Sequence, residues 1–295
     1  MNTQDQLSRL QNGGMHMKIG FIGAGKAGFS LGKYLTERGI EITGYYNHHP
    51  ESAKEAALFT GTRAYDSKDQ LVADSDMLFL TVPDRAILPV WEEIKSLGIQ
   101  NKIICHISGA HSSELFSGIK ELGAFGYSIH PLFAFHDRYT AYKGLSGTFF
   151  TIEGDPARLD QIKQLLDCMG NRYAVIKTDS KTKYHAAAAI VSNLYVGLSA
   201  FGLGLLEECG FSAEEAQEAL APLIRNNAEN IASAGPVSAL TGPIERNDTE
   251  TVMAHLSCMS EAQAEVYRIL SKEVVKVAKA KNPDRDYTMM EDILK

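Results

Sequence analysis

The sequence predicts an α/β protein with a doubly wound, mostly parallel sheet, followed by an all-α domain. Short apolar runs alternate with amphipathic stretches from Lys18 to Ile176, and such alternation is typical of a parallel sheet covered by helices on both faces. After Lys177 the strand patterns stop and helical spacing continues. A chain of 295 residues is long enough for two domains. We therefore predict a nucleotide-binding domain at 17–178 and a helical domain at 179–295.

The elements of the first domain follow from apolar runs and from helical spacing. Before the first strand, residues 1–16 lack the apolar core of a signal peptide, which predicts a loose polar extension and no export. Strands are expected at 18–23, 40–46, 77–82, 102–108, 124–130, 148–154 and 172–176. Helices are expected at 26–38, 51–59, 84–97 and 156–169.

The second domain is predicted to contain only helices, at 182–209, 213–232, 248–255 and 261–280. Its first helix contains an uncharged apolar stretch, 184–206, long enough to cross a bilayer. This stretch is rich in Ala and Gly, carries His185, Ser192 and Asn193, and stands alone in the chain. We therefore expect a helix buried on all sides and no membrane span.

Composition excludes some classes of function. The net charge is −7 and no block of Lys and Arg is present, which disfavours nucleic-acid binding because that needs a concentrated basic patch. The four cysteines are widely separated and form no CxxC pair: Cys105, Cys168, Cys209 and Cys258. They are interpreted as reduced thiols of a cytoplasmic protein.

A full GxGxxG motif follows the first predicted strand and opens the first predicted helix. It reads Gly23-Ala24-Gly25-Lys26-Ala27-Gly28. In this context the first glycine permits a tight turn, the second lets a pyrophosphate approach the backbone, and the third lets the helix pack against the strand. The free N–H groups of the helix then point at the phosphates. The motif predicts a Rossmann-type dinucleotide site.

The end of the second strand suggests which dinucleotide binds. An Asp or Glu there would accept hydrogen bonds from the ribose of NAD and repel a 2′-phosphate. This sequence has Asn47, His48 and His49 instead. Asn47 can donate to phosphate oxygens, and a nearby phosphate favours the charged form of imidazole. NADP is therefore the predicted cofactor; the alternative is an ordinary polar loop with Pro50 opening a helix.

The third strand of the expected sheet also ends at the ligand side. Ligands of open parallel sheets lie beyond the carboxyl ends of the strands. Thr81, Val82 and Pro83 follow this strand and should flank the cofactor. Asp84 is interpreted as the N-cap of the next helix.

Several segments together resemble a family of Rossmann-like oxidoreductases whose C-terminal half is a domain of unknown function. The segments begin with KIGFIGAGKAGFSLGKYL and include SIHPLFAF, KYHAAAAIVSNLYVGL and LTGPIERNDTETVMAHL. The family is similar to pyrroline-5-carboxylate reductases and, more distantly, to β-hydroxyacid dehydrogenases. The resemblance implies an NADP-binding domain, a helical domain like the C-terminal one of 6-phosphogluconate dehydrogenase, and a homodimer joined through these helices. This sequence departs from the family pattern at Asn47-His48-His49, where the family usually has a Ser-Arg-Ser type sequence, and at Asn247, where it usually has Gly.

Two candidates for chemistry end predicted strands. Ser108 can donate a hydrogen bond to a substrate heteroatom, and its alternative role is that of a cap or turn residue. His130 is the leading candidate acid for hydride-transfer chemistry, and its alternative role is to hold the following loop through backbone hydrogen bonds.

Further candidates lie in the helical domain. His185 and Asn193 fall on an otherwise apolar helix, where unpaired polar groups are costly to bury. Lys183 is interpreted as a solvated residue at the start of this helix. Arg246 is interpreted either as an anion-binding residue or as the ion-pair partner of a capping Asp248.

The histidines near one sheet edge do not predict a metal. They are His106, His111, His130 and His136, and their spacing is not that of a zinc site. The predicted function is therefore an NADP-dependent reductase or dehydrogenase for a small carbonyl or imine compound. Two alternatives stay open: a non-catalytic NADP sensor or scaffold, and a deazaflavin-dependent oxidoreductase.

Overall fold

A computed structural model describes residues 17–295, so the extension predicted at 1–16 lies outside the described residues. The chain divides into two compact units, one ending at Ser192 and the other spanning Asn193–Lys295. The change from strands to helices occurs close to the predicted position, and the division between units falls later because the first helix after the sheet packs with the first unit.

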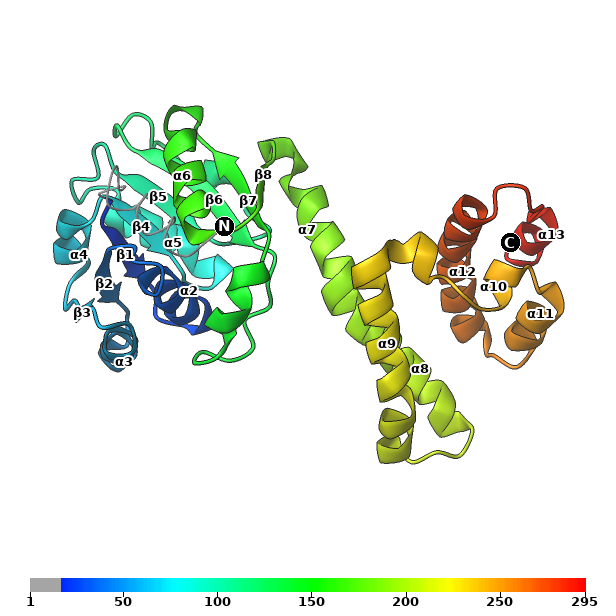
Figure 1. Ribbon diagram of the computed structural model, residues 1–295. Helices are drawn as coiled ribbons and strands as arrows, with labels where there is room; N and C mark the ends of the chain where they lie inside the picture. Colours follow the sequence, from blue (N-terminus) through cyan, green and yellow to red (C-terminus); the bar gives the residue numbers. More distant parts are fainter. Residues whose placement is uncertain (1–16) are drawn as a thin grey trace. The chain divides into compact units, whose positions relative to one another are not determined.

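The first unit is built on an eight-stranded sheet in the order β3-β2-β1-β4-β5-β6-β7-β8 (Figure 1). All neighbours run parallel except β6 and β7. The predicted doubly wound, mostly parallel sheet is thus confirmed. The strands are β1 (Ile19–Ile22), β2 (Ile42–Tyr46), β3 (Arg63–Ala64), β4 (Met77–Leu80), β5 (Ile103–His106), β6 (Phe125–Pro131), β7 (Phe150–Gly154) and β8 (Tyr173–Val175).

The two faces of this sheet carry separate cores, because successive side chains of a strand point to opposite faces. On β4, Phe79 belongs to one core and Leu80 to the other. The face of Phe79 is covered by α2 (Lys26–Thr36), α3 (Pro50–Thr60) and α6 (Leu159–Met169). The opposite face is covered by α4 (Lys68–Asp74) and α5 (Asp84–Ile94), where Trp91 is fully buried against Phe116. The short elements β3 and α4 of this unit were not predicted from the sequence, and neither were its 3₁₀ segments, such as Ala141–Gly147.

The helix after the sheet is interrupted. It consists of α7 (Lys181–Ala189), a π-helical turn (Ile190–Leu194) and α8 (Tyr195–Glu208), where one continuous helix was predicted. A π-turn inserts an extra residue into the helical ladder and shifts the faces of the segments on either side. The division between the two units falls inside this turn.

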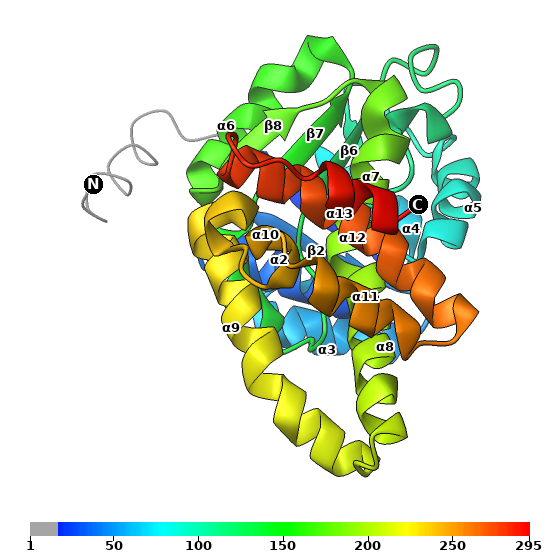
Figure 2. The ribbon, with the colours of Figure 1, turned by 90° about the vertical axis from the view of Figure 1, so that its right-hand side faces the viewer.

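The second unit contains only helices among its described residues, as predicted. They are α8, α9 (Ala213–Ala239), α10 (Pro243–Arg246), α11 (Thr249–Ser257), α12 (Glu261–Lys281) and α13 (Thr288–Ile293). The helices α8 and α9 form an antiparallel pair (Figures 1 and 2). Capping boxes open α9 at Ser212 and α12 at Ser260. A small core forms around Val252, Val275 and Met290.

Two residues before α11 have defined contacts in this unit. Asp248 is the N-cap of α11 and accepts hydrogen bonds from the backbone N and the hydroxyl of Thr251. Asn247, where the family resemblance implies Gly, adopts a left-handed φ of 61°. Asparagine tolerates this conformation better than most residues, and its Nδ2 donates to the carbonyl of Asp286 at 2.8 Å.

The expectation that the apolar helix is buried on all sides is wrong for the single chain. Val191 and Val196 are 75% and 69% exposed, and Ile190 and Leu194 are also exposed. One helical stretch of the described chain, 178–208, is long and apolar enough to cross a membrane, and its most apolar window has no buried residue. Periodicity predicts a helix but does not say whether its own chain covers it.

Candidate functional site

The glycine turn between β1 and α2 has little room for side chains at two of its three glycines. Gly23 has a φ of +113°, and a Cβ there would lie 2.6 Å from the carbonyl oxygen of Thr81. A Cβ on Gly28 would lie 2.3 Å from the Thr81 hydroxyl. Nothing lies within 4 Å of the corresponding position on Gly25. The turn is therefore tight on the sheet side and open at the start of the helix, which is the space that a pyrophosphate needs.

The start of α2 is suited to an anion. Gly25 is the N-cap and contributes no side-chain hydrogen bond, and the first turn of the helix has no acidic residue. Lys26 is exposed there. Free N–H groups and the positive end of the helix dipole both favour phosphate at such a position. The geometry fits a dinucleotide; its binding by Gly23, Ala24, Gly25, Lys26, Ala27 and Gly28 stays a prediction.

Asn47 is committed to backbone contacts. Its Oδ1 accepts a hydrogen bond from the N–H of Ala24 at 3.1 Å, and its Nδ2 donates to the carbonyl of His49 at 3.1 Å. It thus ties the end of β2 to the glycine turn. His48 and His49 are exposed, with ring centroids 5.2 Å apart. Asn47 therefore supports the turn, and the two imidazoles beside it are open to solvent.

The segment after β4 joins the glycine turn to the neighbouring strand ends. The hydroxyl of Thr81 donates to the carbonyl of Gly23 at 2.7 Å, and Val82 and Pro83 follow it. The N-cap of α5 is Pro83, and Asp84 is the first residue of the helix. The prediction of Asp84 as N-cap is therefore wrong: its carboxylate instead accepts a hydrogen bond from the Ser108 hydroxyl at 2.9 Å.

Ser108 is buried in the turn after β5. Besides donating to Asp84, its Oγ accepts from the backbone N–H groups of Ala110 and His111 at 3.2 and 3.1 Å. These contacts are those of a turn-forming serine. The hydroxyl proton of Ser108 is directed at the Asp84 carboxylate and is not available to a substrate. Ser108 therefore contributes to the site mainly by shaping the turn.

His130 forms a pair with a tyrosine that the sequence analysis did not single out. Its Nδ1 lies 2.6 Å from the Tyr184 hydroxyl. Burial, followed by the positive charge of Lys181 and the neighbouring His185, lowers the pKa of His130 to about 4. Burial raises the pKa of Tyr184. At neutral pH the phenol therefore keeps its proton and donates to Nδ1, and we assign the ring proton of His130 to Nε2.

Two imidazole rings converge on Gly109. A Cβ on Gly109 would lie 2.7 Å from Cδ2 of His185 and 2.9 Å from Nε2 of His130. Only a residue without a side chain fits between them. His185 belongs to α7 and is exposed, so the pair combines an enclosed ring and an accessible one. Asn193 lies in the other compact unit, so no shared site with His185 is described.

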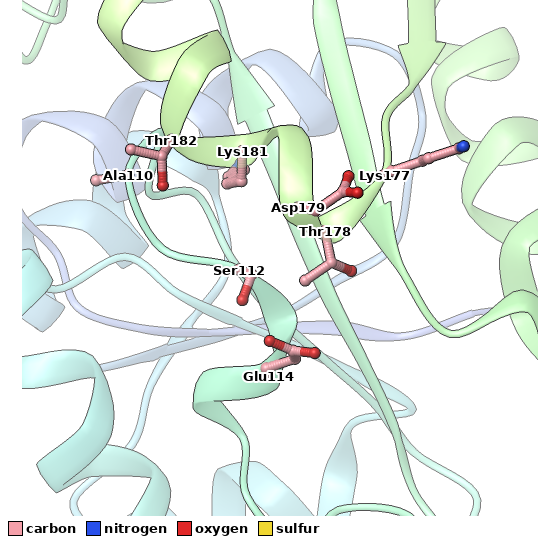
Figure 3. A pocket seen from close by; sticks show the side chains of 8 residues that line it. All are labelled: Ala110, Ser112, Glu114, Lys177, Thr178, Asp179, Lys181 and Thr182. Carbon is pink, nitrogen blue, oxygen red and sulfur yellow. The ribbon is translucent and has the colours of Figure 1, made fainter.

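A polar pocket opens beside this turn (Figure 3). Its volume is about 550 Å³, which is in the range of small-molecule sites. The lining side chains come from the segment after β5, from the segment between β8 and α7, and from the start of α7: Ala110, Ser112, Glu114, Lys177, Thr178, Asp179, Lys181 and Thr182. A small polar compound held there would contact Ala110, the residue that follows the Ser108–Gly109 turn.

His106, one of the histidines weighed as metal ligands, has other partners. Nε2 of His106 lies 3.1 Å from the carbonyl of Ser112, and its Nδ1 accepts from the N–H of Ser108. Both ring nitrogens are thereby engaged. Among residues 17–295, no group of three or more His, Cys, Asp or Glu side chains is arranged to hold a metal ion.

Two family models match different parts of the chain. Residues 18–108 match the family model described as NADP oxidoreductase, coenzyme F420-dependent. Residues 148–274 match the domain of unknown function DUF2520. The chain thus combines a dinucleotide-binding Rossmann domain of oxidoreductase type with this C-terminal domain, and the resemblance inferred from the motifs is confirmed.

Solved structures share the fold. A protein from Thermotoga maritima is 26% identical with a TM-score of 0.67, over 89% of this chain and 99% of that one. A pyrroline-5-carboxylate reductase from Coxiella burnetii is 17% identical with a TM-score of 0.60, over 90% of this chain and 99% of that one. At the latter identity the likeness shows the fold alone.

One curated enzyme matches over part of its length. A glycerol-3-phosphate dehydrogenase of the NAD(P)+ type from Leptospira biflexa is 31% identical over 123 residues. The match covers 34% of this chain and 37% of that enzyme, so the chain aligns with little more than a third of its relative.

Proposed function

We propose that the protein is an NADP(H)-dependent oxidoreductase that transfers a hydride to or from a small carbonyl or imine compound. The observation that carries the proposal is the convergence of His130 and His185 on Gly109, at the carboxyl edge of the sheet. The glycine turn opens at the same edge, and Thr81 and Asp84 link the two places by hydrogen bonds. A positioned nicotinamide and a proton donor are the two requirements of this chemistry.

The absence of an acid at the end of β2 favours NADP over NAD. The exposed His48 and His49 can donate ring N–H groups to a 2′-phosphate, which an Asp at position 47 would repel. When bound, the nicotinamide supplies or accepts the hydride.

The side chains of His130 and Tyr184 supply the proton that the substrate heteroatom takes up. In the reducing direction the substrate carbon gains the hydride, the π bond of C=N or C=O breaks toward the heteroatom, and the heteroatom takes the proton from Nε2 of His130. The Tyr184 hydroxyl restores a proton to the ring at Nδ1, and solvent returns one to Tyr184. A neutral imidazole suits this step because Nε2–H is a donor without the cost of burying a charge.

A deazaflavin cofactor is the second candidate. The family model that matches the first domain names coenzyme F420 in its description. A deazaflavin would use the same glycine turn but has no adenosine 2′-phosphate, so the exposed histidines at the end of β2 would contribute little to its binding.

Two further parts of the proposal concern the assembly and location of the chain. We propose a homodimer joined through the helices that follow the sheet, because their apolar side chains are exposed in the single chain. The apolar face of this helix was expected to be buried by its own chain, and a second copy of the chain would bury it instead. We also propose that the protein acts in the cytoplasm on a small molecule, without nucleic acid or membrane as partner.

Titration of the purified protein with NADPH, NADH and reduced coenzyme F420 tests the cofactor, with binding followed by fluorescence. We expect tight binding of NADPH and a large loss of affinity in Asn47→Asp. Cyclic imines and ketones are then screened for turnover, which should be lost in His130→Ala and His185→Ala while NADPH binding remains. Binding of F420 alone would favour the second candidate. Tight NADPH binding without turnover of any compound would point to a sensor, and binding of no cofactor would remove the basis of the proposal.

A further inference from the structure

Lys181 is a buried lysine at the edge of the polar pocket beside the candidate site. It is the first residue of α7 and only 2% exposed. Its Nζ donates to the hydroxyl of Ser128 at 2.6 Å, and Ser128 donates to the carbonyl of Ser108 at 3.1 Å. Ser128 is itself fully buried on β6. One chain of hydrogen bonds therefore runs from α7 through the sheet to the turn that carries Gly109.

Charged and titratable groups from four neighbouring elements face this ammonium group. The carboxylates are Glu153 on β7 and Asp84 on α5, and the imidazoles are His106 on β5 and His130 on β6. Both carboxylates have other partners: Glu153 accepts from Ser113 and Thr178, and Asp84 accepts from Ser108. Burial lowers the pKa of Lys181 to about 8 against the pull of these carboxylates, so the ammonium form predominates at neutral pH.

A buried lysine is costly, and lysine is rarely found fully buried unless it is paired. A purely structural link between α7 and β6 could be made by a neutral hydroxyl or amide. The cationic group therefore calls for a reason beyond packing, and the ring of His130 supplies one. The Lys181 ammonium lies 5.4 Å from the centre of the Tyr184 ring, and the hydroxyl of Tyr184 lies 2.6 Å from Nδ1 of His130. A positive charge this near the imidazole opposes its protonation.

We propose that Lys181 is a positioning residue of the candidate site, which fixes the Ser108–Gly109 turn through Ser128 and sets the charge state of the His130 ring. Its kinetic consequence rests on the function proposed above. Its electrostatic consequence does not, because the charge state of His130 can be measured in a protein that turns over no substrate.

Two substitutions separate the two roles. Lys181→Gln keeps an N–H donor for Ser128 and removes the charge, so the pKa of His130 should rise from about 4 toward its ordinary value of 6.5. Ser128→Ala keeps the charge and removes the link to Ser108, so the turn should loosen while the pKa of His130 stays low. Lys183→Gln is the matched control, because Lys183 lies on the same helix and is exposed.

NMR titration of histidine-labelled protein measures the pKa of His130, with its signal assigned from the spectrum of His130→Gln. The proposal is supported if that pKa rises in Lys181→Gln and does not change in Lys183→Gln. It is overturned if a folded Lys181→Gln protein titrates like the parent. Should this variant fail to fold, Lys181→Met tests the same point, since it also removes the charge and must therefore raise the pKa of His130.

A kinetic measurement then tests the consequence for catalysis. In Lys181→Gln the acidic limb of the kcat profile should move to higher pH, with kcat near pH 6 reduced by up to about fourfold and the Kd of NADPH unchanged. If the pKa of His130 rises in Lys181→Gln but the parent protein turns over no substrate, the proposed function is contradicted. The electrostatic role of Lys181 is then still supported. Turnover with an unmoved acidic limb would overturn the positioning role.

Discussion

The Ser108 hydroxyl donates to the Asp84 carboxylate at 2.9 Å, across the gap between the segments that follow β4 and β5. The bond joins the strand end that contacts the glycine turn to the strand end that carries Gly109. Because Ser108 also accepts two backbone N–H groups, its side chain organises the whole turn.

Ser108→Ala should therefore weaken both stability and activity. Loss of these buried contacts leaves polar groups unpaired, at a cost of about 1–3 kcal/mol in the free energy of unfolding. Urea unfolding and steady-state kinetics would measure the change. Ser117→Ala is the control, since Ser117 is an exposed serine beyond the turn. Equal effects of the two substitutions would contradict the role given to Ser108.

Gly109→Ala should abolish turnover while NADPH binding is kept. The added methyl group would lie 2.7 Å from the His185 ring and 2.9 Å from that of His130, so one ring must move. Gly147→Ala is a matched control, because nothing lies within 4 Å of its added methyl group. Combining Gly109→Ala with His185→Ala should relieve part of the crowding and restore the thermal stability lost by the single variant. No recovery would show that the methyl group disturbs something else.

The glycines of the turn should respond differently to the same substitution. Gly28→Ala places a methyl group 2.3 Å from the Thr81 hydroxyl and 2.4 Å from the carbonyl of Gly23, so it should lower the Tm. Gly25→Ala meets nothing within 4 Å and should leave the Tm unchanged but raise the Kd of NADPH at least tenfold. Calorimetry and fluorescence titration distinguish these outcomes. Unchanged affinity in Gly25→Ala would exclude the turn as the pyrophosphate site.

Acid should destabilise the protein through its buried imidazoles. Burial lowers the pKa of His106 to about 4 from an ordinary 6.5, so the unfolded chain binds the proton more readily. The stability is complete above pH 6.5 and falls as the pH drops toward 4, by on the order of 3 kcal/mol for this fully buried ring. Urea unfolding at several pH values measures the slope, which should be smaller in His106→Gln and unchanged in His49→Gln. An equal slope in all three proteins would assign it to other groups.

Charge on the apolar helix should separate the proposed dimer. Val191→Glu with Val196→Glu places two carboxylates at side chains that are 75% and 69% exposed in the single chain. Light scattering after gel filtration should show a dimer for the parent and a monomer for this variant. Leu58→Glu is the control, because Leu58 is 85% exposed on α3. A parent protein that is monomeric in buffer but binds lipid vesicles would instead support a membrane role for this helix.

The order of strands and helices was predictable because it depends on local periodicity. The glycine motif was predictable for the same reason, since its residues are neighbours in the chain. The pair of His130 and Tyr184 was not, because it joins residues 54 positions apart through the packing of α7 on the sheet.

Lys181 and Asp84 show a second limit of the sequence. A lysine at the start of a helix and an acid after a proline both have common surface roles, as a solvated residue and as a cap. Their actual partners, Ser128 and Ser108, come from other strands. Whether a polar residue at a helix start is buried depends on what the fold brings against it, and periodicity carries no such information.

The two hydrogen bonds of Asn47 connect coenzyme choice to backbone architecture. Asn47→Asp keeps an acceptor for Ala24 but loses the donor to His49, so any redesign toward NAD at this position also releases the loop that presents the histidines. Swapping coenzymes in this scaffold will therefore need at least one compensating change beside position 47, such as a new partner for the His49 carbonyl, before selectivity and folding can be adjusted independently.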